Sequence, residues 1–111
     1  MSDKTLLSLA VKSSNYQKVA ILFSDKTVTF LFSQLLQTRE VETNTIERIE
    51  QLTESEKIIT ELQYYKHLSQ EAKQRCLVIS SQIPQNRDGI FLTQPLTEAK
   101  VENALDRFLS L

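Results

Sequence analysis

The chain has 111 residues, 41% of them hydrophobic and 24% charged, proportions close to those of average soluble globular proteins and suited to one domain with one core. Its 13 basic and 14 acidic side chains nearly cancel, so neither a broad nucleic-acid footprint nor a polybasic membrane segment is indicated. A single glycine and two prolines also argue against a glycine-rich phosphate loop.

The sequence gives no sign of a membrane span or a secretory leader. Its longest clean apolar run, residues 19–23, is far shorter than the roughly 20 residues that cross a bilayer. The start of the chain lacks the small-x-small pattern of signal-peptide cleavage. Because Cys76 is the only cysteine, no internal disulfide can form. We therefore expect a cytoplasmic protein.

The first third of the chain predicts a helix, a buried strand and a second helix. Residues 3–12 place Leu6, Leu7, Ala10 and Val11 on one helical face, which predicts an extra N-terminal helix within residues 1–17. Residues 18–24 are apolar without alternation, as in a strand buried on both faces. The next predicted helix begins at Ser24 or Asp25 and buries one apolar stripe, made of Val28, Leu31, Phe32, Leu35 and Leu36.

The middle of the chain continues this alternation. Residues 39–43 predict an edge strand, and residues 44–52 predict a helix in which Asn44 and Glu47 are spaced as a capping box and Ile46 and Ile49 face inward. A buried strand follows at 57–62. Residues 64–75 have a helical composition that Ser69 could interrupt to start a separate turn.

The last third predicts two more strands and the clearest helix. Residues 76–81 and 89–93 are apolar strands, and Thr97 is placed to cap a helix with Leu96 and Val101 as a hydrophobic staple. The buried face of that helix comprises Val101, Ala104, Leu105, Phe108 and Leu109. Alternating apolar strands and helices predict a single α/β domain over residues 1–111, with a doubly wound, mostly parallel sheet of about five strands.

The order of elements over residues 18–111 resembles the receiver domain of bacterial response regulators, which has a flavodoxin-like fold. The most specific stretch is GIFLTQPLTEAKVENALDRFL at 89–109, since the family closes on an apolar strand, a Lys-Pro pair and an amphipathic helix. Thirteen steps separate Ser81 from Gln94, which is short for a receiver, and QIPQNRDG lacks an amphipathic pattern. We therefore expect the fourth helix of the fold to be reduced or missing.

The resemblance implies a degenerate acidic pocket. Asp25 matches part of the acidic pair that binds Mg²⁺ in the family, but Ser24 stands where the second carboxylate would be. Glu61 matches the phosphate-accepting aspartate and Ser80 the hydroxyl residue, whereas Gln94 replaces the lysine. Asp25 and Glu61 could also bring like charges together and raise one pKa.

Phosphotransfer needs a positioned carboxylate, a divalent cation and a positive charge on the developing oxygens. Ser24, Glu61 and Gln94 each depart from the family's pattern in a way that weakens this reaction. We therefore expect no enzyme activity, no catalytic residue, no metal and no cofactor. Glu61 could act instead as a fixed charge resembling a phosphorylated aspartate, although the missing lysine weakens that idea.

Other conspicuous residues have ordinary structural interpretations. Cys76 is expected to be a small buried hydrophobe and the lone His67 a solvated helix residue. Phe91 matches the family's aromatic switch position. For Tyr64 and Tyr65 we favour rings that cover the strand ends over a binding epitope, and all three aromatic residues are candidates for contacting a partner.

The sequence thus favours a non-catalytic pseudo-receiver that regulates a protein partner without phosphorylation. A structural subunit of a larger complex and a small-ligand-sensing pseudo-receiver are the alternatives, and a phosphorylatable receiver is less favoured. Neither nucleic acid nor a membrane is an expected partner, and a homodimer is left open.

Overall fold

Five parallel strands form one sheet in the order β2-β1-β3-β4-β5. The computed structural model describes residues 18–53, 56–82 and 88–110. The strands are β1 (Lys18–Leu22), β2 (Glu42–Thr45), β3 (Lys57–Glu61), β4 (Cys76–Ser80) and β5 (Ile90–Thr93). The helices are α2 (Lys26–Thr38), α3 (Leu62–Tyr65), α4 (Gln70–Gln74) and α5 (Glu98–Leu109), with a 3₁₀ turn, η1 (Ile49–Gln51), between β2 and β3. This is the predicted α/β, flavodoxin-like arrangement.

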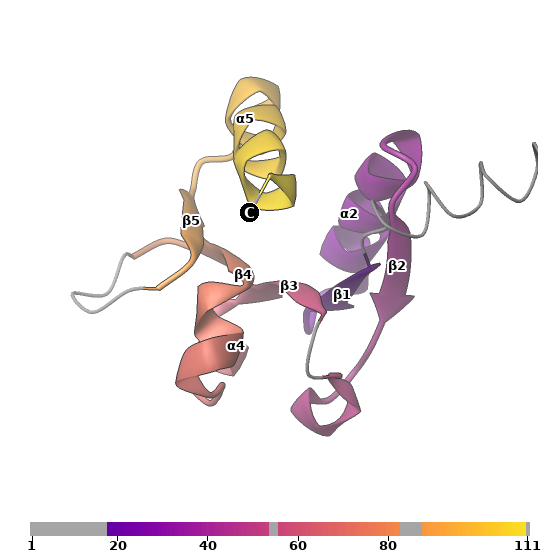
Figure 1. The fold of residues 1–111 in the computed structure, drawn as a ribbon. Coiled ribbons are helices and arrows are strands. Elements are labelled where there is room, and N and C mark those ends of the chain that lie inside the picture. The colour runs from indigo at the N-terminus through magenta and orange to yellow at the C-terminus, as the bar shows by residue number, and fades with distance from the viewer. Residues whose placement is uncertain (1–17, 54–55, 83–87, 111) are drawn as a thin grey trace, which may run out of the picture.

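The helices cover both faces of the sheet, with α2 and α5 on one side and α4 on the other (Figure 1). Alternate strand residues point to opposite faces, which is why the buried positions of the three central strands are apolar apart from Thr60 and Ser80. On the first face Phe32 and Leu36 of α2 and Leu105 and Phe108 of α5 pack in one cluster with Ile59. The second face is covered by shorter elements, which bury Ile58, Tyr65, Leu68, Ala72, Cys76 and Val78.

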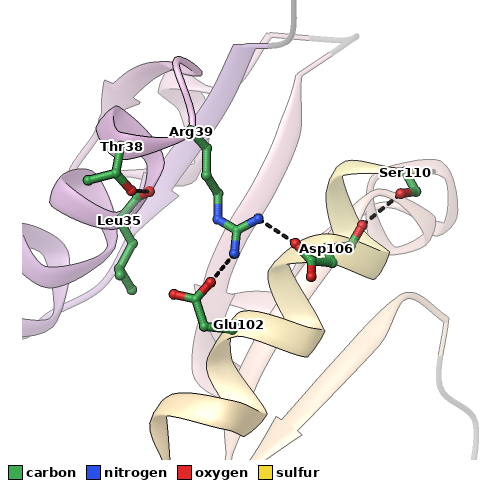
Figure 2. Close-up of polar contacts among 6 residues, drawn as sticks. All are labelled: Leu35, Thr38, Arg39, Glu102, Asp106 and Ser110. Carbon is green, nitrogen blue, oxygen red and sulfur yellow. Dashed lines mark hydrogen bonds and ion pairs between the residues drawn. The ribbon is translucent and has the colours of Figure 1, made fainter.

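An ion-pair cluster joins the two helices of the first face. Arg39 is the residue that follows α2, and its guanidinium donates one hydrogen bond to Glu102 and another to Asp106 of α5 (Figure 2). Glu102 and Asp106 lie one turn apart, so a single planar fork reaches both carboxylates. At the end of α5 the Lys57 ammonium donates to the carbonyl oxygens of Phe108 and Leu109, each at 3.1 Å. Together these contacts fix the C-terminal halves of α2 and α5 over the sheet.

The helix caps follow the sequence closely. Asp25, Ser69 and Thr97 each accept a hydrogen bond from a backbone N–H in the first turn of α2, α4 and α5, respectively. Such side chains satisfy N–H groups that have no partner within the helix. The predicted start of α2, the predicted interruption at Ser69 and the predicted cap at Thr97 are confirmed.

The prediction of a helix at 44–52 was wrong. Asn44 lies in β2, and the Ile46 N–H donates to the Ile21 carbonyl oxygen at 3.0 Å, which carries the pairing with β1 past the expected helix start. The Asn44 side chain, expected to cap a helix, donates instead to the buried carboxylate of Glu56 at 3.3 Å. Only the short turn η1 remains, and the Gln51 side chain accepts from the backbone N–H of Arg48 at its start.

Three other expectations differ in detail or cannot be compared. The edge strand begins at Glu42 rather than at residue 39, because Glu40 ends the preceding turn with φ 59° and the Val41 N–H bonds to Leu36. Leu31, expected on the buried stripe of α2, is 46% exposed. The predicted helix at 3–12 lies outside the described residues. The fourth helix of the fold was expected to be reduced or missing between β4 and β5, and the described residues of that segment, 81–82 and 88–89, form no helix.

Candidate functional site

The candidate site lies at the carboxyl edge of the sheet, where β1, β3, β4 and β5 end. In a parallel sheet these ends share one edge, and ligands of open α/β folds bind there. Ser24 and Asp25 follow β1, Glu61 ends β3, Ser80 ends β4 and Gln94 follows β5. The four residues expected from the resemblance, Asp25, Glu61, Ser80 and Gln94, therefore do lie along this edge, and their side chains differ in what they contact.

The ends of β1 and β3 are joined by three polar side chains. The Ser24 hydroxyl donates to Glu61 Oε1 at 2.9 Å, and the Gln63 amide donates to the same oxygen. Gln63 Nε2 also lies 3.3 Å from the Ser24 hydroxyl oxygen, which can accept from it. One carboxylate oxygen of Glu61 is thus shared by two neutral donors. Gln63 was not identified from the sequence, although a polar residue two positions after a strand end is a natural neighbour of that end.

The Asp25 carboxylate is directed to the start of α2 rather than to Glu61. Its Oδ1 accepts from the Thr27 N–H at 2.8 Å and from the Val28 N–H at 3.4 Å. This is the ordinary geometry of an N-cap, in which the side chain also stabilises the positive end of the helix dipole. The residue that was expected, from the resemblance, to belong to an acidic pair is therefore occupied as a helix cap.

The Ser80 hydroxyl is occupied by its own backbone turn. It donates to the Gln82 carbonyl oxygen at 2.6 Å and accepts from the Gln82 N–H at 3.0 Å. Ser80 is only 7% exposed. A buried hydroxyl that both donates and accepts within its own turn has little capacity left for a phosphoryl group.

The Gln94 side chain is exposed, and the Lys100 side chain of α5 donates hydrogen bonds to the backbone on either side of it. The Gln94 N–H donates to the Ser80 carbonyl oxygen at 3.3 Å, and the Gln94–Pro95 peptide bond is cis. The Lys100 ammonium of α5 donates to the carbonyl oxygens of Thr93 and Pro95 at 2.7 and 2.8 Å. A cation is thus present near this strand end, but it holds backbone carbonyls.

The candidate aromatic residues form part of the second face. The rings of Tyr65 and Phe91 meet edge to face, with centroids 5.2 Å apart. Tyr65 is 3% exposed, and its burial raises the pKa of its hydroxyl. Tyr64 and Phe91 remain half-buried. Of the three, only Tyr64 and Phe91 keep surface that another molecule could contact.

An open hollow of about 490 Å³ adjoins the carboxyl edge. It is lined by residues of the β2–β3 link and of the α3 region, namely Glu47, Arg48, Ile49, Glu50, Gln63, Tyr64 and His67. Gln63 therefore faces both this hollow and the Ser24–Glu61 contact, which connects the two features. His67 is exposed on its rim.

Cys76 lies in the core on the second face and is fully buried. Burial raises the pKa of its thiol to about 12, although Arg75 and Lys73 oppose the shift. The thiol donates to the Ala72 carbonyl oxygen at 3.2 Å. Because nucleophilic cysteines need a stabilised thiolate, this environment is that of a structural residue.

Comparison with known proteins does not assign this site to a family. Neither known protein-family models nor curated protein sequences match the chain. Across the described ranges, no group of three or more His, Cys, Asp or Glu side chains is placed to hold a metal ion. Of the helices that the structure describes, none combines the length and apolar character needed to span a membrane.

Proposed function

We propose that the protein is a non-catalytic, receiver-like module that binds a protein partner in the cytoplasm and does so independently of phosphorylation. The observation that carries this proposal is the Ser24–Glu61–Gln63 contact, in which the residue at the phosphate-acceptor position accepts hydrogen bonds from two neutral side chains. The hydroxyl and amide thereby supply neutral donors to Glu61 Oε1, whereas phosphotransfer would need a divalent cation beside the accepting carboxylate.

The remaining positions of the pocket support the same proposal. Asp25 is held by the start of α2, and Ser80 by the backbone of Gln82. Forming an acyl phosphate requires opposite charge around the transferring oxygens, and removing one preorganised donor already costs about 3 kcal/mol of transition-state stabilisation. A site with a neutral amide at Gln94 and no second carboxylate at Ser24 lacks several such contributions at once.

The first experiment tests phosphorylation. Purified protein is incubated with acetyl phosphate and Mg²⁺, and intact-mass spectrometry records phosphate incorporation, with an active receiver as positive control. We expect no incorporation. Incorporation that disappears in Glu61→Gln but persists in Glu102→Gln, a matched change on α5, would overturn the proposal.

The second experiment tests partner binding. Native cytoplasm is passed over immobilised protein, captured proteins are identified by mass spectrometry, and each candidate is purified and its affinity measured. We expect a partner whose affinity is unchanged by Glu61→Gln and reduced by a Phe91→Ser change. A partner that binds only after treatment with a phosphodonor would contradict the proposal, as would the absence of any purified protein that binds.

A small-ligand-sensing module is the second candidate, and the hollow beside Gln63 favours it. Its lining combines a tyrosine, a histidine and both signs of charge, a mixture that can orient a polar molecule. A metabolite mixture screened by thermal shift tests it. A stabilising fraction whose effect is lost in Gln63→Ala and kept in Gln70→Ala supports this candidate.

A further inference from the structure

The outward face of α2 has no charged side chain after its first residue, Lys26. Its exposed positions are Thr27, Phe30, Leu31, Gln34, Gln37 and Thr38. Phe30 is 65% exposed and Leu31 is 46% exposed, and they are the exposed large hydrophobic residues of the described ranges. We name this set of six residues the α2 patch.

The α2 patch differs from the outward faces of α4 and α5. On α5 the exposed positions include Glu98, Asp106 and Arg107, and on α4 they include Glu71. The solvated faces of α4 and α5 thus carry charged side chains, as is usual for amphipathic helices. Aromatic enrichment with few charges is typical of the core of a protein interface, and adjacent exposed apolar side chains mark a surface that another segment covers.

The chain that precedes β1 is long enough to reach the α2 patch. The Cα atom of Lys18 is paired with that of Glu42, which starts β2 just after α2 ends, so β1 begins next to the end of α2. From Thr38 back to Phe30 is about 12 Å along the helix axis. Five extended residues, 13–17, span about 17 Å, which covers that distance.

We propose that residues 3–12 of the same chain bind the α2 patch. Their sequence places Leu6, Leu7, Ala10 and Val11 on one helical face and its charges, Asp3, Lys4 and Lys12, at the two ends. An uncharged apolar face thereby meets an uncharged patch centred on Phe30 and Leu31, so no charged side chain loses its hydration without a partner. The proposal does not depend on the proposed function, since it concerns the opposite face of α2 from the sheet.

Hydrogen exchange of the full chain tests the proposal. The amides of residues 5–12 are followed by mass spectrometry in the unmodified protein and in a Phe30→Gln/Leu31→Gln double variant. Both substituted side chains are exposed, so folding should be kept, and the amides of β4 serve as the internal check. We expect residues 5–12 to exchange at least about tenfold more slowly than an unstructured peptide, and to lose this protection in the double variant.

The matched control is Ala99→Gln/Asn103→Gln, which changes two exposed positions of α5 and should leave residues 5–12 protected. Exchange of residues 5–12 at the unstructured rate in the unmodified protein would overturn the proposal, as would equal protection in both double variants. Protection that rises with protein concentration, together with a dimer mass by light scattering, would show that a second copy covers the α2 patch and would also overturn it.

Discussion

The Tyr65 hydroxyl and the backbone of Asp88 bond to each other in both directions, each at 2.9 Å. The hydroxyl donates to the Asp88 carbonyl oxygen and accepts from the Asp88 N–H. The Tyr65 ring packs on Phe91 at the same time. A side chain from the end of α3 therefore fixes the backbone leading into β5 and covers its Phe91.

Removing the Tyr65 hydroxyl should weaken the contact between α3 and the backbone that leads into β5. Tyr65→Phe keeps the ring contact with Phe91 but leaves two backbone groups of Asp88 without their partner, and we expect the free energy of unfolding to fall by about 1–3 kcal/mol. Urea unfolding measures the change. Tyr64→Phe is the matched control, since Tyr64 makes neither of the Asp88 bonds, and an equal loss in both variants would contradict the assignment.

Gly89, the single glycine, follows Asp88 directly and occupies a position that a larger residue does not fit. Gly89 has φ 90°, and a Cβ there would lie 2.6 Å from the carbonyl oxygens of both Cys76 and Lys73. Gly89→Ala combines an unfavourable backbone conformation with a backbone clash, so we expect a loss of at least about 2 kcal/mol by urea unfolding. Asn103→Ala, at an exposed position of α5, should change stability by less than about 0.5 kcal/mol. A Gly89→Ala protein as stable as the original would show that the β5 start can shift.

Most of the fold followed from local patterns. Apolar runs located β1, β3 and β4, and the caps at Asp25 and Thr97 set the starts of the two long helices. The failure at 44–52 came from tertiary pairing, because the Ile46 N–H bonds to β1 and a single-segment pattern contains no such partner. Leu31 was misplaced because the apolar stripe of α2 is wider than the part that the sheet buries.

The sequence predicted where the candidate site lies, but it did not predict most of the side-chain contacts within it. Parallel strands imply that the residues after each strand meet at one edge, as Ser24 and Glu61 do. Asp25, the residue expected beside Glu61, caps α2 instead. The role of Gln63 and the reach of Lys100 to Thr93 depend on side-chain geometry across loops, which spacing along the chain does not encode. The same limit concealed the bond between Tyr65 and Asp88.

The Arg39 cluster should contribute modestly to stability. Arg39 is 21% exposed while Glu102 and Asp106 are 44% and 64% exposed, so solvent screens the pairs. We expect Arg39→Met to cost about 0.5–1.5 kcal/mol at low salt and less in high salt. Arg107→Met, an exposed arginine on the same helix as the two acids, is the control. A loss independent of salt would indicate that the aliphatic stem of Arg39, rather than its charge, holds α2 to α5.

The buried thiol of Cys76 predicts a pH dependence above the neutral range. Its pKa is raised by burial to about 12, against 9.0 for an unperturbed cysteine, so the folded chain keeps this proton at pH values where the unfolded chain loses it. The stability that this group contributes is therefore complete below its unfolded pKa and is lost as the pH rises toward its folded pKa.

Two measurements check this. The free energy of unfolding of the original protein, minus that of Cys76→Ala, should fall by roughly 2 kcal/mol between about pH 8 and pH 10.5. The subtraction is needed because Tyr65, with a raised pKa, and Lys57, whose pKa is lowered by burial, titrate in the same range. At about pH 8 a thiol reagent should label Cys76 at least a hundredfold more slowly than in urea, because labelling requires opening of the core. Equal labelling rates in buffer and in urea would show that Cys76 is accessible and its pKa unshifted.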